Sequence, residues 1–181
     1  MRVVFLDRDG VINKDPAGKM YVTKWKDFSF LPRAKRAVCL LCKNGFKVVL
    51  ISNQAGVGKG LFSKKKLAFI TDNMQKALKK SGGRVHGVFY CTHRSEDDCN
   101  CRKPKAGLIH MATKRFPCDL TKTYFIGDTI RDVMAARQAG CRSILIFTGK
   151  EKPSNKKNWE TQPKHTFSDL YEAVEFIVGK K

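Results

Sequence analysis

Two aspartates near the N-terminus have the spacing and the setting of a reactive site. Asp7 and Asp9 lie one residue apart directly after the apolar run Val3–Leu6, and Gly10 follows them. Such a run is typical of a buried parallel strand, and ligands of parallel sheets bind at the carboxyl ends of the strands. Two carboxylates there repel each other unless a cation lies between them. The pattern indicates a metal-assisted site, and an Asp-rich turn that caps the next element is the alternative.

A second apolar run ends in polar residues that could hold a phosphate. The stretch VVLISNQAGVGKG leads from a predicted strand to Ser52, Asn53 and Gln54 and then into a glycine-rich loop. A hydroxyl group and neighbouring backbone N–H groups can bind phosphate oxygens. The glycine loop is weak evidence alone, because it does not match the phosphate-binding loop of nucleotide-binding proteins, and Ser52 could instead cap a helix.

A third apolar run carries carboxylates at its end. In YFIGDTIRD, Asp128 follows the run directly and Asp132 comes one helical turn later. Asp128 can join Asp7 and Asp9 around a hard cation, since such ions prefer oxygen ligands. The alternative is that Asp128 caps its helix. Together the alternatives require several coincidences, whereas one metal and phosphate site explains all three strand ends.

Three cysteines and one histidine have the spacing of a closed metal site. The stretch CTHRSEDDCNC holds a C-x-H pair and a C-x-C pair separated by five residues. Three thiolates and one imidazole fill the tetrahedral coordination of Zn²⁺, which indicates a structural ion rather than a catalytic one. Disulfide bonds are the alternative, and a reducing compartment disfavours them. The predicted zinc ligands are Cys91, His93, Cys99 and Cys101.

Two basic residues directly follow the last predicted zinc ligand. Arg102 and Lys103 can balance the charge of a phosphate dianion and of the carboxylates. Placing these two side chains would then be the task of the zinc loop. The other cysteines, which have no histidine partner, are expected as buried small residues or free thiols, with a redox-active pair at 39 and 42 as the alternative. They are Cys39, Cys42, Cys118 and Cys141.

Apolar strands alternate with helical patterns along the chain, which predicts a parallel sheet with helices on both faces. The five predicted strands are Val3–Leu6, Lys47–Ser52, Gly87–Cys91, Thr123–Gly127 and Ser143–Phe147. The predicted helices are Arg33–Lys43, Lys64–Lys80, Gly107–Arg115, Ile130–Ala139 and Asp169–Val178. Two insertions fall outside this alternation, Lys14–Leu31 and Thr92–Lys105.

The 181 residues are expected to form a single domain over residues 1–181, with a zinc loop at 91–105, a basic loop at 149–164 and a final helix. No apolar run approaches the roughly 18 residues of a membrane span, and the N-terminus lacks the flanks of a signal peptide. We therefore expect a cytoplasmic protein that does not bind membranes.

The net charge of +20 favours anionic partners, such as phosphorylated metabolites, nucleic acid or an acidic membrane surface. The lysines are spread over the predicted helices and the basic loop, with few aromatic residues among them. A solvated basic surface is therefore favoured over a dedicated nucleic-acid face.

Four motifs together resemble the haloacid dehalogenase (HAD) superfamily of aspartyl phosphatases. They are DRDGVIN, ISNQAGVGKGLF, the zinc-loop pattern ending in CRKPKAG, and GDTIRDVMAARQAG. More narrowly, the chain is similar over residues 2–148 to the branch that holds D-glycero-D-manno-heptose 1,7-bisphosphate phosphatases and the histidinol-phosphate phosphatase domain. The resemblance implies an α/β three-layer sandwich, a HAD-like Rossmannoid fold with a central five-stranded parallel sheet, a small zinc-binding loop and no large cap domain.

The resemblance also implies roles for the residues above. Asp7 would attack phosphorus, while Asp9 would protonate the leaving alcohol and then activate water. Mg²⁺ would bind Asp7, Asp128 and the backbone carbonyl of Asp9, and Asp132 would orient Lys103 or the Asp128 loop. The implied catalytic residues are Asp7, Asp9, Ser52 and Lys103, and the implied substrate contacts are Asp7, Arg8, Asp9, Ser52, Asn53, Gln54, Arg102 and Lys103.

The chain departs from the family pattern in three places. Ser52 stands where relatives carry threonine, the zinc loop is short, and the segment LPRAKRA lacks the glycine often found after its proline. The resemblance implies a hydrolase of a small phosphorylated metabolite, foremost the sugar bisphosphate D-glycero-D-manno-heptose 1,7-bisphosphate. We expect the protein to be a monomer. Histidinol phosphate is the alternative substrate, and a nucleic-acid 3′-phosphatase is the alternative that the charge favours.

Overall fold

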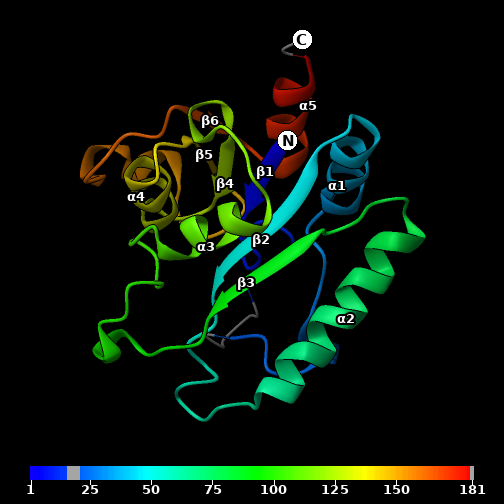
Figure 1. The fold of residues 1–181 in the computed structure, drawn as a ribbon, viewed down its shortest axis with the longest axis vertical. Helices are drawn as coiled ribbons and strands as arrows, with labels where there is room; N and C mark the ends of the chain where they lie inside the picture. Colours follow the sequence, from blue (N-terminus) through cyan, green and yellow to red (C-terminus); the bar gives the residue numbers. More distant parts are fainter. Residues whose placement is uncertain (16–20, 180–181) are drawn as a thin grey trace.

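A sheet of six parallel strands forms the centre of the molecule, in the order β3-β2-β1-β4-β5-β6 (Figure 1). The computed structural model describes residues 1–15 and 21–179. The strands are β1 (Val3–Leu6), β2 (Lys47–Asn53), β3 (Gly87–Cys91), β4 (Tyr124–Gly127), β5 (Arg142–Ile146) and β6 (His165–Phe167).

The central strand β1 is apolar on both faces because helices cover it on both sides. Val4, Phe5 and Leu6 have no exposed surface. Val4 and Leu6 face a core built with α1, α2 and α5, whereas Phe5 faces a second core built with α3 and α4. The helices are α1 (Ala34–Lys43), α2 (Lys64–Lys80), α3 (Gly107–Arg115), α4 (Ile130–Gln138) and α5 (Leu170–Gly179). The predicted three-layer α/β sandwich is confirmed.

The register of the strands brings the reactive strand ends to one edge of the sheet. Leu6 of β1 pairs with Leu50 of β2 and with Ile126 of β4. The residues that follow on each strand therefore emerge at the same edge, as parallel strands require.

The prediction of five strands was wrong by one. The missed strand β6 has only three residues, none of them buried, and it pairs with β5 at the edge of the sheet. A segment this short and this exposed has no apolar alternation that a sequence pattern could reveal.

The helix predicted to start at Arg33 begins at Ala34 instead. Arg33 has a φ of 59°, in the left-handed region that favours glycine, and it stands where the resemblance led us to expect a glycine. Its guanidinium contacts Asp169 at 2.6 Å, so this ion pair links the start of α1 to the start of α5. The other predicted helices differ from the observed ones by at most a residue at each end.

Neither insertion forms a large cap in the parts that the structure describes. Each contains one short 3₁₀ helix, Trp25–Asp27 in the first and Ser95–Asp97 in the second. Residues 16–20 of the predicted insertion Lys14–Leu31 lie outside the described residues. The expectation of an open site without a large cap domain is confirmed.

Within residues 1–15 and 21–179, no helix is long and apolar enough to span a membrane.

Candidate active site

A cavity of about 140 Å³ opens at the carboxyl edge of β1, β2 and β4. Seven of the predicted site residues line it: Asp7, Asp9, Ser52, Asn53, Arg102, Lys103 and Asp128. Arg8 and Gln54 have no exposed surface and lie outside the lining. The predicted contacts of Arg8 and Gln54 with a substrate stay predictions.

Asp7 is held at the end of β1 by the neighbouring strand and by a lysine. Its backbone N–H donates to the carbonyl of Ile126 at 3.0 Å, and its Oδ2 lies 2.8 Å from Nζ of Lys103. Burial raises the pKa of Asp7 to about 6, although the Lys103 ammonium acts in the opposite direction. Near neutral pH this carboxylate is ionised and poorly solvated, which suits a nucleophile.

Lys103 is only 3% exposed and connects the carboxylates of two elements. Its Nζ lies 2.8 Å from Asp7 and 2.6 Å from Asp132, and it donates to the carbonyl of Ile51 at 3.0 Å. Burial alone would lower the pKa of Lys103, but Asp132 and Asp7 raise it overall. The side chain is therefore a permanent positive charge beside the nucleophile.

The backbone of Lys103 is fixed by Asn53 at the end of β2. The Asn53 side chain donates to the Lys103 carbonyl at 3.0 Å and accepts from its N–H at 3.1 Å. Both polar groups of the Asn53 amide are thus engaged with the zinc loop. The predicted contact between Asn53 and a substrate stays a prediction.

Asp9 is surrounded by donors. Arg8 contacts it with Nε at 3.0 Å and Nη2 at 2.9 Å, Asn13 donates at 2.8 Å and Gln54 donates at 2.8 Å. Burial acts to raise the pKa of Asp9, but Arg8 and these hydrogen bonds lower it overall. In the substrate-free protein Asp9 is a carboxylate in a fixed orientation, with its side chain 21% exposed toward the cavity.

Asp128 fits tightly between two glycines. A Cβ atom built at Gly10 would lie 2.3 Å from Oδ2 of Asp128, and one at Gly149 would lie 1.9 Å from it. Gly10 also has a φ of 76°, so this position requires glycine on both counts. Burial raises the pKa of Asp128 well above its ordinary value, and the charges of Asp132 and Asp7 add to that effect.

The carboxylates of Asp7, Asp128 and Asp132 lie within 4.8 Å of one another. Buried acids this close together favour a bound cation, and hard oxygen donors suit Mg²⁺. Asp132 is also held by hydrogen bonds from Thr129. Its Oδ2 accepts from the N–H of Thr129 at 3.0 Å and from the Thr129 hydroxyl at 2.7 Å. These bonds and the Lys103 contact match the predicted orienting role of Asp132.

The predicted zinc ligands converge as the spacing indicated. Sγ of Cys99 lies 3.5 Å from Sγ of Cys91 and 3.4 Å from Sγ of Cys101, and Nδ1 of His93 lies 3.6 and 3.3 Å from Cys91 and Cys101. A tetrahedral Zn²⁺ site has ligand-to-ligand edges of about 3.5 to 3.8 Å. The donor set and its geometry therefore fit one ion.

The cavity also contains residues that sequence reasoning missed. They are Asp15, Tyr21, Thr129, Arg131 and Lys150. Lys150 lies in the loop after β5 and not directly at the end of the strand, so the strand-end rule that found Asp128 did not single it out. Arg131 lies on the first turn of α4, between Asp128 and Asp132 in the sequence, and only this position pointed to the site.

The similarity to known proteins extends over the whole chain. A HAD-hydrolase-like family model matches residues 100–173. D-glycero-beta-D-manno-heptose-1,7-bisphosphate 7-phosphatase of Neisseria meningitidis is 32% identical over 98% of this chain and 95% of its own. The protein of that name from Bordetella bronchiseptica is 39% identical over 82% of each chain.

A solved structure gives the same result. The crystal structure of D,D-heptose 1,7-bisphosphate phosphatase from B. bronchiseptica, complexed with magnesium and phosphate, matches with a TM-score of 0.94 at 34% identity and covers 100% of both chains. The chain is thus a phosphatase, and it belongs to the heptose-bisphosphate phosphatase family of the HAD-like hydrolases.

Proposed function

We propose that this chain removes the phosphate on carbon 7 of D-glycero-D-manno-heptose 1,7-bisphosphate. The observation that carries the proposal is the convergence of Asp7, Asp9 and Lys103 at one strand edge, with Asp7 Oδ2 2.8 Å from the lysine ammonium. The named relatives that cover most of this chain support the choice of substrate.

Asp7 would act as the nucleophile. Its carboxylate oxygen forms a bond to phosphorus while the bond between phosphorus and the sugar oxygen breaks, and Asp9 gives that oxygen a proton. Water then attacks the aspartyl-phosphate, Asp9 takes a proton from it, and phosphate leaves. Because Arg8 and hydrogen bonds lower the pKa of Asp9 in the free protein, Asp9 has to take up a proton before it can act as the acid in the first step.

Lys103 and Ser52 would hold the transferring oxygens. The ammonium of Lys103 is already desolvated and fixed, so it can stabilise developing charge without reorganisation. Ser52 is buried beside it and offers a hydroxyl at the cavity wall. Asn53, Gln54, Arg8 and Arg102 complete the predicted set of substrate contacts.

The acidic cluster would hold Mg²⁺ through Asp7, Asp128 and the backbone carbonyl of Asp9. The ion would offset the repulsion between the Asp7 carboxylate and the phosphate oxygens. Asp128 is already held in place, since its carboxylate packs against Gly10 and Gly149 and its Oδ2 accepts from the N–H of Lys150 at 3.0 Å.

The thiol and imidazole cluster would hold Zn²⁺ as a structural ion. Burial raises the pKa of the Cys91 thiol to about 12, so metal binding must displace a proton there. With all four positions filled by protein, the role of the ion would be to fix the loop that carries Arg102 and Lys103. The single-domain organisation, monomeric state and cytoplasmic location stay predictions.

The test is Mg²⁺-dependent phosphate release from heptose 1,7-bisphosphate, histidinol phosphate and a 3′-phosphorylated oligonucleotide, compared by kcat/KM. We expect a preference of about 100-fold or more for the heptose, which corresponds to about 2.7 kcal/mol of transition-state discrimination. A preference for histidinol phosphate or for the oligonucleotide would overturn the proposed substrate and leave the catalytic roles in place.

A further inference from the structure

A groove away from the active-site cavity runs beside β5 and β6. It consists of two cavities of about 520 and 390 Å³, which share Gln162, Pro163 and Lys164 in their walls. None of the described residues that line it also lines the active-site cavity. We call the two cavities together the edge groove, and the cations that line it are Arg137, Arg142, Lys156 and Lys164.

The positive charge of the edge groove is not balanced by acids. Within residues 1–15 and 21–179, no acidic side chain lines the groove, and none of its four cations forms an ion pair. By contrast, Lys103 and Lys105 of the zinc loop each contact an aspartate. Unpaired cations that line one groove attract anions, because their fields add there.

Uncharged groups hold both arginines of the edge groove in place. Nη1 of Arg137 donates to the hydroxyl of Thr161 at 3.0 Å, and Nε of Arg142 donates to the carbonyl of Thr121 at 2.8 Å. Each guanidinium has five N–H donors, so each keeps several for a ligand. The groove therefore presents two anchored guanidinium groups, which suit phosphate oxygens.

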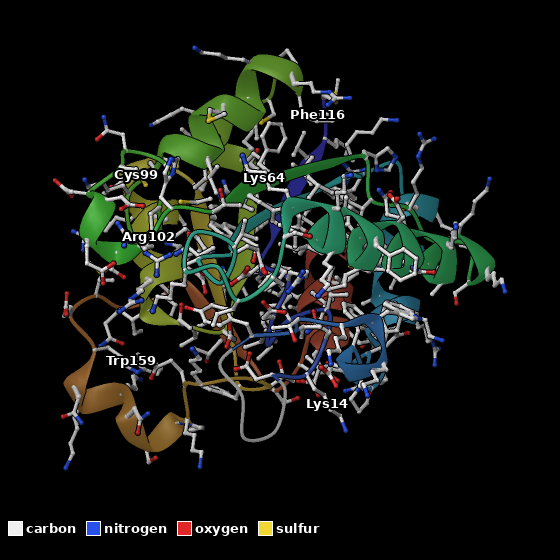
Figure 2. The ribbon with its side chains drawn as sticks, turned by 90° about the horizontal axis from the view of Figure 1, so that it is seen from below. Lys14, Lys64, Cys99, Arg102, Phe116 and Trp159 are labelled. Carbon is white, nitrogen blue, oxygen red and sulfur yellow. The ribbon has the colours of Figure 1, made fainter. Side chains whose placement is uncertain are left out.

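An aromatic pair lies at the other end of the edge groove. Trp159 stacks on Phe147, with ring centroids 6.3 Å apart and 22° between the ring planes, and both residues line the groove. The indole Nε1 donates to Oε2 of Glu151 at 2.8 Å, which fixes the orientation of the ring. Figure 2 shows Trp159 on the segment between β5 and β6, at the periphery of the molecule.

The length of the groove favours an extended ligand. Arg142 also lines a third cavity, of about 560 Å³, which contains the further cations Arg2 and Lys122. A compact metabolite would fill one of these cavities, whereas a chain of linked anionic groups can pass through all three.

We propose that the edge groove binds single-stranded nucleic acid, with phosphates at Arg137, Arg142 and Lys164 and a base against Trp159. A single strand matches both features of the groove, since it carries regularly spaced phosphates and base faces that are free to stack. An acidic peptide would use the cations and leave the aromatic pair without a partner. The proposal also gives a role to the net charge of +20, which the hydrolysis of a sugar phosphate does not require.

The sequence favoured a solvated basic surface because few aromatic residues lie among the lysines. The fold supplies the missing combination, since Trp159 shares the edge groove with cations from α4 and β5.

The test measures the affinity for a 15-residue oligothymidylate that has a 5′ fluorophore and a 3′ hydroxyl, by fluorescence anisotropy over a series of salt concentrations. At about 0.15 M salt, each phosphate contact to a single strand contributes a factor of about 4. The combined substitutions Arg137→Gln, Arg142→Gln and Lys164→Gln should therefore weaken binding about 50-fold and reduce the salt slope by about 2. Lys164→Gln alone should weaken it about 4-fold, and this side chain makes no hydrogen bond or ion pair to the described residues that its loss could disturb.

Trp159→Leu separates stacking from charge. It should weaken binding about 5-fold or more and leave the salt slope unchanged, because stacking releases no counterions.

The matched control removes the same charge from another face. Lys65→Gln, Lys76→Gln and Lys79→Gln together change three exposed positions on α2. Figure 2 shows the start of this helix, at Lys64, well apart from Trp159. Because salt screens charges separated by more than about 8 Å at this ionic strength, the affinity should stay within about twofold of the wild type.

Three results would overturn the proposal. Wild-type protein that does not bind the oligonucleotide at about 0.15 M salt would exclude it directly. Equal losses in the groove variant and the α2 variant would show attraction by the whole basic surface. Equally tight binding of poly-L-glutamate, together with no effect of Trp159→Leu, would identify the groove as a site for an acidic protein.

Discussion

The sheet edge and the zinc loop hold their reactive groups in different ways. At the sheet edge, Asp7 and Asp128 directly follow buried strands. The backbone N–H of Asp7 donates to the carbonyl of Ile126 on β4, and the backbone N–H of Lys150 donates to Oδ2 of Asp128. The zinc loop instead runs through mostly exposed residues from Thr92 to Asn100, and the side chains of its four predicted zinc ligands contact one another.

This difference distinguishes the groups that the fold positions from the groups that a bound metal would position. The fold alone places the nucleophile, because the register of β1, β2 and β4 sets the edge. The cations that serve it, Arg102 and Lys103, directly follow the last thiol of the cluster. A metal ion bound by that cluster should therefore control activity without moving Asp7.

The largest expected effect is the loss of the zinc ligands. Cys101→Ser should lower kcat/KM on the order of 100-fold and lower the melting temperature, because the loop that carries Arg102 and Lys103 loses its crosslink. The matched control is Cys118→Ser, which lies outside the cluster. Metal analysis should find zinc in the wild-type protein and little in the variant. A Cys101→Ser protein as active and as stable as the wild type would show that the zinc loop, like the sheet edge, is positioned without a metal.

A smaller effect is expected where the two regions meet. Asn53→Ala removes two hydrogen bonds to the Lys103 backbone and should cost about 1 to 3 kcal/mol of unfolding free energy in the absence of substrate. A residue that only contacted the substrate would leave this stability unchanged. Asn73→Ala is the control, since that side chain bonds only within its own helix α2. Equal denaturant midpoints for both variants would contradict the assigned contact.

The smallest effect concerns the acidic cluster and pH. Burial raises the pKa of Asp7 to about 6, so without a cation this group stabilises the fold at low pH and loses that contribution as pH rises through about 6. Protons and Mg²⁺ compete for the same carboxylate, and one pH unit below that pKa only about a tenth of it is ionised. Mg²⁺ should therefore raise the melting temperature more at about pH 7.5 than at about pH 5. Equal shifts at both values would show that Asp7 does not bind the ion.

Much of the site could be predicted from the sequence because its determinants are local. Asp7 and Asp128 each follow an apolar run, and the cysteine spacing specifies a tetrahedral donor set without knowledge of the fold. The helix α2 was predicted with its observed bounds, since Ser63 caps its start and a regular apolar stripe runs along it.

The features that escaped prediction depend on contacts between distant segments. Asn53 reaches a backbone 50 residues away, and Arg131 lines the cavity together with zinc-loop residues that lie far from it in the sequence. The strand β6 is assigned through its pairing with β5 rather than through its own pattern. Such features need the register of the sheet, which the sequence does not display.

The central claim, that the sheet edge carries covalent chemistry at Asp7, is tested most directly by rapid acid quenching during turnover of a ³²P-labelled substrate. We expect labelled protein whose phosphate is released by hydroxylamine, as an acyl phosphate requires, and no label in Asp7→Asn. Wild-type turnover without labelled protein, together with phosphate release by Asp7→Asn, would contradict the claim.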